Sequence, residues 1–327
     1  MNALKETKKK HLLAILKYLY LHNSSTMNEL VENLQLSQPS IRNMVRTLQE
    51  KQLIQEVGND LSSGGRCPTR FALNEKNYLI LCLYVQVDKV IYQLRNFNEI
   101  KKEGILFYQS EDELKKTIKD LIDQEKIHCC QIAVEGIVYE DVYVTDHHNV
   151  LEKHQWLKDI KKEIDLPIQL QNDVKMIHQG CYFTYQQDST YYLYINEVGI
   201  GSSYFYKDEP LYGRSGIMGE IGLISLKGKT INQQIRECQN QEEFNEILSL
   251  LLSMVFTMID PKRLELSLDL KWRYEENIIE KVLNEINQSC FENLYFHEDV
   301  SSMLFDGLVY RGVVYLLKER IEKNEKI

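Results

Sequence analysis

The start of the chain shows apolar side chains at the three- and four-residue spacing of amphipathic helices. The stretch His11–His22 predicts a first helix with one apolar face. A second helix is predicted after Thr26, because Thr26 and Glu29 form the sequence signature of a capping box. The apolar positions of these two helices are Leu12, Leu16, Leu19, Met27, Leu30, Val31 and Leu34.

Ser37 and the apolar spacing after it predict a third helix, which tolerates Pro39 in its first turn. The buried face of this helix consists of Ile41, Met44, Val45 and Leu48. The opposite face presents side chains that can bond to phosphates and base edges, namely Gln38, Ser40, Arg42, Asn43, Arg46 and Gln49. None of these is acidic, which is typical of a recognition helix in the major groove of DNA.

Two short strand patterns follow the third helix and enclose a loop rich in Gly and Ser. Leu53–Val57 and Arg70–Leu73 predict the strands, and Arg66 lies near the tip of the loop Gly58–Pro68. A hairpin in this place is the wing of a winged helix-turn-helix, so Ser25–Leu73 is predicted to read DNA, with Arg66 among the DNA-binding residues. The alternative is a pair of helices used only for packing or dimerisation.

Beyond the polar segment Asn74–Asn77, the pattern changes to that of a larger domain. Tyr78–Val87 is apolar at nearly every position, as expected of a strand buried on both faces. Strand and helix patterns then mix, so an α/β fold is predicted. The predicted domains are a DNA-binding domain of residues 1–76 and an effector and dimerisation domain of residues 77–327. Further predicted strands are Val90–Asn96, Ile105–Tyr108, Cys130–Val134, Ile168–Leu170, Tyr191–Ile195, Ser202–Tyr206 and Arg263–Leu268, and further helices are Asp112–Gln124, Trp156–Glu163, Val174–Thr184, Glu242–Ile259, Glu276–Gln288 and Leu308–Ile321.

Charge is unevenly distributed along the 327 residues. Residues 1–73 hold ten Lys and Arg against six Asp and Glu, a balance of +4, whereas the whole chain carries −9. A basic head on an acidic body is typical of a DNA-binding domain joined to a separate effector domain.

The most apolar predicted helix, near Phe244–Ile259, has an uncharged run of about 13 residues, which is too short to span a bilayer. With no signal-peptide pattern and no regular spacing of the seven Cys, we expect a cytoplasmic protein with reduced thiols and no membrane contact.

Four segments of the predicted body carry motifs in order along the chain. They are Asn172-Asp173 after a strand, a Gly turn at Val198–Ser202, Gly219-Glu220-Ile221-Gly222, and a helix end leading into a strand at Ile259–Leu266. Together with Gly64-Gly65-Arg66 in the wing, they resemble the ROK family, named for repressors, open reading frames and kinases. The order of head and body resembles that of its xylose-repressor-type transcriptional regulators. The resemblance implies a winged helix followed by an actin-like (ribonuclease-H-like) sugar-kinase fold with two lobes around a cleft.

The resemblance also implies a ligand site in the body. In the kinase members, the Asp that matches Asp173 is the catalytic base, and the residues that match Asn172 and Glu220 hold sugar hydroxyls. We therefore expect ligand contacts from Asn172, Asp173, Gly219 and Glu220. The alternative is that Asn172 and Asp173 form only a helix N-cap.

Departures from the family pattern oppose catalysis. Kinase members carry an Asp-x-Gly-x-Thr phosphate motif on the first hairpin of the body, whereas Val85–Val90 has neither the Gly nor the Thr. Asp269-Leu270 replaces the Gly pair that would seat adenosine. Leu223 replaces the His of the family's zinc site, and Cys238 stands alone where a Cys-rich run is expected. We therefore expect no enzymatic activity, no cofactor and no metal.

The sequence thus predicts a sequence-specific transcriptional regulator, a repressor of carbohydrate-utilisation genes such as those for xylose. It is expected to bind a palindromic double-stranded DNA operator as a homodimer or homotetramer, and to respond to a sugar or sugar phosphate. Two alternatives stay open. One is a sugar kinase with a fused DNA-binding head, in which Asp173 is the base. The other is a ligand-independent regulator whose body only dimerises.

Overall fold

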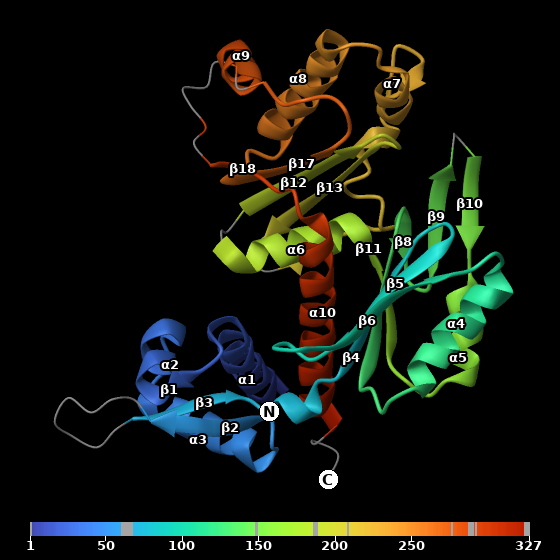
Figure 1. The fold of residues 1–327 in the computed structure, drawn as a ribbon. Coiled ribbons are helices and arrows are strands. Elements are labelled where there is room, and N and C mark those ends of the chain that lie inside the picture. Colours follow the sequence, from blue (N-terminus) through green and yellow to red (C-terminus); the bar gives the residue numbers. More distant parts are fainter. Residues whose placement is uncertain are drawn as a thin grey trace.

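The computed structural model describes residues 2–59, 68–147, 150–185, 189–207, 209–275, 277–286, 291 and 293–323. Figure 1 shows three parts, which are a small head at the lower left, a first lobe at the right and a second lobe at the top. A long helix near the C-terminus, α10 (Val300–Lys323), runs between them from top to bottom.

The head consists of three helices and a three-stranded sheet with the order β1-β3-β2. Both predicted caps are present, because Thr26 Oγ1 accepts a hydrogen bond from Glu29 N at 3.2 Å and Ser37 Oγ accepts one from Ser40 N at 3.4 Å. The Glu29 carboxylate completes the capping box by accepting from Thr26 N at 2.8 Å. The elements are α1 (Asn2–His22), β1 (Ser25–Thr26), α2 (Met27–Leu34), α3 (Gln38–Glu50), β2 (Ile54–Asn59) and β3 (Thr69–Leu73).

The predicted wing is present as the hairpin of β2 and β3, but its tip lies outside the described residues. The predictions for Arg66 and for Gly64-Gly65-Arg66 therefore concern residues outside the part of the chain that the structure describes. The first helix begins at Asn2, nine residues before the predicted start. Its first turns are mostly polar and so lack the apolar spacing on which the prediction relied, although no Gly or Pro interrupts them.

The first lobe is a five-stranded sheet with the order β11-β7-β4-β5-β6, in which β4, β7 and β11 run parallel. The helices α4 (Glu111–Asp123) and α5 (Trp156–Glu163) pack on one face of this sheet, and α10 packs on the other. The strands are β4 (Ile80–Val85), β5 (Lys89–Arg95), β6 (Ile100–Phe107), β7 (Cys129–Val134) and β11 (Ile168–Asn172). A small antiparallel sheet beside them consists of β8 (Ile137–Tyr139), β9 (Val142–His147) and β10 (Val150–His154).

The second lobe is a five-stranded sheet with the order β14-β13-β12-β17-β18. Three helices, α7 (Ile231–Glu237), α8 (Gln241–Met258) and α9 (Asn277–Glu285), pack on its outer face. The helix α6 (Asp173–Tyr185) lies on its inner face, between this sheet and α10 (Figure 1). The strands are β12 (Ser189–Asn196), β13 (Ile200–Tyr206), β14 (Glu209–Pro210), β17 (Arg263–Asp269) and β18 (Leu294–Phe296), and β15 (Ser225–Leu226) pairs with β16 (Lys229–Thr230) in a small hairpin.

Helices α6 and α10 approach each other closely at two glycines. A Cβ on Gly180 would lie 2.1 Å from the carbonyl oxygen of Met303, and one on Gly307 would lie 2.0 Å from that of Met176. Since no side chain separates the two backbones there, only Gly allows this crossing. The prediction that the last helix starts at Leu308 is wrong by eight residues, since α10 starts at Val300. Ser301, Ser302 and Gly307 have weak helix propensity, but the packing of α10 against α6 offsets it.

One hydrophobic core runs from the head into the body. It includes Leu16 and Phe71 of the head, Tyr78, and Leu308 of α10.

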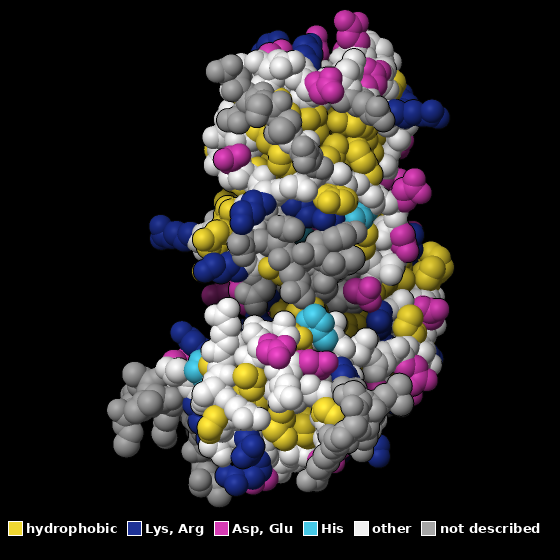
Figure 2. All heavy atoms as spheres, turned by 90° about the vertical axis from the view of Figure 1, so that its left-hand side faces the viewer, with side chains coloured by type: hydrophobic (Ala, Val, Ile, Leu, Met, Phe, Trp, Pro, Cys, Tyr) yellow, Lys and Arg dark blue, Asp and Glu magenta, His cyan; other side chains and the backbone are white. Residues whose placement is uncertain are grey.

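Within the described residues, one segment, Val300–Ile321, is long and apolar enough by length and composition to cross a membrane, and 61% of its most apolar window is buried inside the protein. Figure 2 shows the side that lies on the left in Figure 1, where acidic and basic side chains are interspersed on the head and hydrophobic side chains gather on the second lobe.

Candidate functional site

A cleft lies between the two lobes, at the carboxyl ends of the parallel strands β7 and β11. Ligands in open α/β sheets bind at this kind of edge. The cleft collects Glu135 after β7, Asn172 and Asp173 after β11, and Glu220 from the loop after β14. The tertiary structure therefore brings together three of the four predicted ligand residues, and it adds Glu135 to them.

Asp173 is the first residue of α6 and is almost fully buried. Burial raises the pKa of its carboxyl to about 8, and the neighbouring carboxylates of Glu135 and Glu220 contribute to this shift. Its Oδ1 accepts a hydrogen bond from Val174 N at 2.8 Å, and the Tyr84 hydroxyl donates to Oδ2 at 3.4 Å. A carboxyl with this pKa can accept or donate a proton near neutral pH.

Asn172 forms the N-cap of α6. Its Oδ1 accepts from Lys175 N at 2.9 Å, and its Nδ2 donates to the carbonyl oxygen of Gly136 at 2.8 Å. The described contacts of the Asn172 side chain are therefore those of a helix N-cap, which was the alternative to ligand binding. One amide hydrogen and one lone pair remain for other partners.

Glu220 faces a buried lysine across the cleft loop. Burial raises the pKa of the Glu220 carboxyl, and the charge of Lys175 partly offsets this effect. Lys175 Nζ donates to the carbonyl oxygen of Gly216 at 3.4 Å and lies 5.5 Å from the ring centre of Tyr212. Burial lowers the pKa of this ammonium group.

Two functional candidates at the cleft were missed from the sequence. Glu135 directly follows the buried strand β7, and this position at a strand end was the available signal. The Tyr84 hydroxyl oxygen lies 3.2 Å from Glu135 Oε1 and 3.4 Å from Asp173 Oδ2, so it joins the two carboxyl groups and donates its single hydrogen to one of them at a time. Tyr84 lies within an apolar run, so nothing in the pattern distinguished it from core residues.

The glycines of the cleft loops are explained by packing. A Cβ on Gly219, whose φ is +99°, would lie 2.1 Å from the carbonyl oxygen of Ser202, so this residue holds the loop against β13. Cβ atoms on Gly199 and Gly201 would meet the side chains of Asn232 and Val174 at 2.6 and 2.5 Å. The turn between β12 and β13 is therefore filled by protein atoms next to these glycines.

The family's zinc site does not fit the residues present here. Leu223 offers no ligand atom, and its side chain lines the cleft. The Cys238 thiol donates to the carbonyl oxygen of Asn240 at 3.3 Å. We derive no role for zinc at this place.

The predicted recognition surface on α3 is exposed. The side chains of Gln38, Ser40, Arg42, Asn43 and Arg46 all face solvent. Glu50, one turn further along α3, approaches Arg46, with Glu50 Oε1 3.7 Å from Arg46 Nε. Both side chains are mostly exposed, so the pair contributes only about 0.3–0.5 kcal/mol and can be exchanged for a phosphate at little cost.

Arg70 of the wing is engaged inside the head. Its guanidinium contacts the Glu29 carboxylate at 3.2 Å and the carbonyl oxygen of Ser24 at 3.1 Å. This ion pair ties β3 to the capping box of α2. The hydrogen bonds to Thr26 N and Ser25 and the charge of Arg70 lower the pKa of Glu29.

Comparisons with known proteins agree with this architecture. Residues 105–249 match the model of the ROK family, so the chain carries a ROK family domain. The chain is 23% identical over 229 residues to the xylose repressor of Staphylococcus xylosus. That match covers 64% of this chain and 58% of the length of the repressor, so this chain spans less than two thirds of the relative it matches.

The fold is shared with solved ROK structures. A ROK family transcriptional regulator, a homologue of the E. coli MLC protein, superposes with a TM-score of 0.66 at 15% identity and covers 94% of this chain and 99% of that one. The ROK hexokinase of Thermus thermophilus superposes with a TM-score of 0.54 at 10% identity, covering 72% and 97%. A ROK protein of Streptococcus pneumoniae in complex with sucrose gives 0.54 at 12% identity, covering 76% and 100%. The predicted fold is thereby confirmed, with a winged helix-turn-helix head on a two-lobed, actin-like body.

Proposed function

We propose that this protein is a sequence-specific DNA-binding transcriptional regulator, a cytoplasmic repressor of carbohydrate-utilisation genes. The observation that carries the proposal is the exposed polar face of α3, which lies on a winged head that precedes a ROK domain. The likeness to a xylose repressor supports the same role.

DNA binding is assigned to α3 in the major groove, with Gln38, Ser40, Arg42, Asn43 and Arg46 reaching base edges and phosphates. Arg66 of the wing is proposed to contact phosphate or the minor groove. A homodimer or homotetramer is proposed because a palindromic operator matches a two-fold symmetric protein.

We propose a neutral sugar as the effector in the cleft, in preference to a sugar phosphate. Glu135, Asp173 and Glu220 contribute three carboxyl groups, against the single ammonium group of Lys175. Ionised carboxylates accept hydrogen bonds from vicinal hydroxyls and repel a phosphate, whereas the protonated Asp173 carboxyl can donate a hydrogen bond to a hydroxyl. The effector can change DNA binding only if it binds the DNA-bound and the DNA-free form of the protein with different affinities.

A sugar kinase is the second candidate. Asp173 supports it, because a base with a pKa near 8 suits the deprotonation of a hydroxyl, and the shared fold includes hexokinases. Gln86-Val87-Asp88 at the β4–β5 turn opposes it, because a phosphate cradle needs a glycine backbone at close approach. We therefore propose that the protein has no catalytic activity.

A third candidate is a regulator whose body only dimerises. The N-cap role of Asn172 favours it, because that contact alone explains the side chain.

The experiment that tests the proposal is selection of fragmented genomic DNA by the purified protein, followed by sequencing. Recovery of a few palindromic sites next to carbohydrate genes is the expected result, and uniform or absent recovery would contradict it. A thermal-shift screen against neutral sugars and their phosphates then separates the candidates, since a ligand specific to the native state raises the Tm. Turnover of ATP with any of these sugars would favour the kinase.

A further inference from the structure

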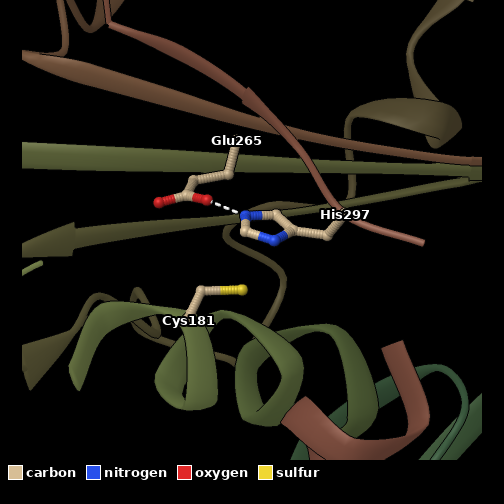
Figure 3. A group of neighbouring side chains, drawn as sticks. All are labelled: Cys181, Glu265 and His297. Atoms are coloured by element: carbon tan, nitrogen blue, oxygen red, sulfur yellow. Dashed lines mark hydrogen bonds and ion pairs between the residues drawn. The ribbon is translucent and has the colours of Figure 1, made fainter. Parts of the chain in front are cut away.

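A group of metal-ligating side chains lies outside the cleft, between α6 and the sheet of the second lobe. Cys181 comes from α6, Glu265 from β17, and His297 from the segment after β18 (Figure 3). One ligand atom from each lies within 4.8 Å of the other two. Cys181 and Glu265 are buried, and the His297 side chain is 9% exposed.

We propose that Cys181, Glu265 and His297 form a zinc-binding site. Thiolate, imidazole and carboxylate are the donors that Zn²⁺ takes in proteins, at about 2.0–2.3 Å from the ion. The three residues lie far apart in the sequence, and none belongs to the family's zinc motif around Leu223 and Cys238. The site is therefore distinct from the one that the family resemblance implied.

The contacts around Glu265 divide its two oxygens between two roles. Arg263 Nε donates to Oε1, while Oε2 faces His297 Nε2. An ion that binds Oε2 and Nε2 replaces the hydrogen bond between them and leaves the contact to Arg263 in place. Such outer contacts orient metal ligands and raise affinity.

The surroundings fix both the arginine and the histidine. The Arg263 guanidinium stacks on the ring of Tyr295, 3.3 Å from its centre. His297 N donates to the carbonyl oxygen of Leu266 at 2.9 Å, and its own carbonyl oxygen accepts from Ser267 Oγ at 2.8 Å. The backbone of His297 is thus held by β17, so the imidazole has to turn about its side-chain bonds, away from Glu265 Oε2, to admit the ion.

The ion balances the charges of two of its ligands. Zn²⁺ with one thiolate and one carboxylate is neutral, which lowers the cost of burying the ion, and the Arg263 guanidinium beside Glu265 leaves one positive charge in the group. The fourth position of the tetrahedron falls to a water molecule or to the thioether of Met303, whose Sδ lies 3.2 Å from Cys181 Sγ. Zinc binding displaces the proton of the Cys181 thiol, since the thiolate is the form that ligates a metal.

A metal here joins three elements of the second lobe. It ties α6 to β17 and to the segment that leads into α10, and α6 begins at Asp173 in the cleft. Zinc therefore stabilises the native state and fixes the helix that carries the cleft residue.

The test measures zinc directly on the full-length protein. Protein stripped with a chelator is titrated with Zn²⁺ in equilibrium dialysis, and bound metal is counted by plasma mass spectrometry. We expect about one ion per chain with a raised Tm. Co²⁺ in place of zinc should give the near-ultraviolet charge-transfer band of a cobalt thiolate.

Three variants complete the test. Cys181→Ser and His297→Gln should each weaken zinc binding by at least about tenfold and remove the zinc-dependent rise in Tm. His297→Gln serves as the second variant if Cys181→Ser does not fold. Cys238→Ser is the matched control, because this buried cysteine of the same lobe donates its thiol hydrogen to the carbonyl oxygen of Asn240 and lies outside the proposed site, and the variant should bind zinc like the wild type. Absence of zinc binding by the wild-type protein, or equal binding by Cys181→Ser, would overturn the proposal and leave the group as a buried network of Arg263, Glu265 and His297.

Discussion

Asp173 shows how one buried side chain makes stability depend on pH. Its carboxyl is protonated in the folded state up to about pH 8, whereas the unfolded chain releases the proton near the ordinary value of 3.8. The folded state therefore binds more protons between these two values, and stability is fully present below the lower one and lost as the pH rises towards the higher one.

Asp173→Asn should remove most of this dependence, because the amide keeps the size of the side chain and carries no proton to lose. The wild-type free energy of unfolding should fall by up to about 5 kcal/mol from pH 4 to pH 8, at 1.36 kcal/mol per pKa unit, and the variant should show a much flatter curve. Urea denaturation at several pH values measures this. Asp159→Asn, at an exposed site, should keep the wild-type dependence. Parallel curves for Asp173→Asn and wild type would refute the assignment.

Arg46 is the residue on which the DNA-binding proposal is most easily tested. Arg46→Ala should weaken operator binding about ten- to a hundredfold, because one good contact to a base or phosphate contributes about 1–3 kcal/mol. Gel-shift titration with a selected operator measures this, and circular dichroism checks the fold.

Glu50→Gln is the matched variant for Arg46. It removes the acidic partner 3.7 Å from Arg46 and should leave affinity unchanged or raise it. Wild-type affinity in Arg46→Ala would remove α3 from the proposed interface.

At the scale of elements, the crossing of α6 and α10 depends on two glycines with backbone atoms opposite them. Gly307→Ala should lower the free energy of unfolding by about 1–3 kcal/mol, because the new methyl group meets the carbonyl oxygen of Met176 and the helices must separate. Urea denaturation of both proteins gives the difference.

Gly312→Ala on the same helix is the control for this prediction. Its Cβ would meet the Ile80 side chain at 2.8 Å, which can rotate away, and Ala favours the helix over Gly. We expect Gly312→Ala to lose less stability than Gly307→Ala. An equal loss in the two variants would show that Gly307 is not required for the close approach of α6 and α10.

The whole molecule is connected through α1 and α10. Tyr20 of the head contacts the rings of Phe97 and Tyr310, with centres 6.0 and 5.4 Å away. Glu209 of the second lobe accepts from Arg311 at 3.1 Å and lies 3.7 Å from Lys17 Nζ. Packed side chains thus connect the cleft to the head through α6, α10 and α1.

This shared core predicts that head and body unfold together. Differential scanning calorimetry of the full-length protein should give one transition rather than two. Tyr20→Ala removes a ring from the junction, should cost about 3 kcal/mol, and should split off a lower transition for the head. Two separate transitions in the wild type would mean that the head folds independently of the body.

Local sequence signals determined much of the secondary structure. The capping box of α2, the Ser37 N-cap of α3 and the apolar spacing of both helices match the structure, because these signals depend on contacts three or four residues apart. The predicted helix Trp156–Glu163 matches α5 for the same reason. The small sheet of β8, β9 and β10 was not predicted, since its strands are three, six and five residues long and their sequences show little alternation of apolar and polar residues.

The ends of α1 and α10 and the roles of single polar residues were decided only by the tertiary structure. The sequence indicated that Asn172, Asp173 and Glu220 belong together, but it left open that Asn172 caps α6 and that Glu135 and Tyr84 complete the group. Cys181, Glu265 and His297 carried no signal at all, because their meeting depends on how α6 packs against β17 and β18. The sequence thus determined the fold class, the head and its presented face, whereas burial and long-range contacts, which no local pattern encodes, decided what surrounds each charge.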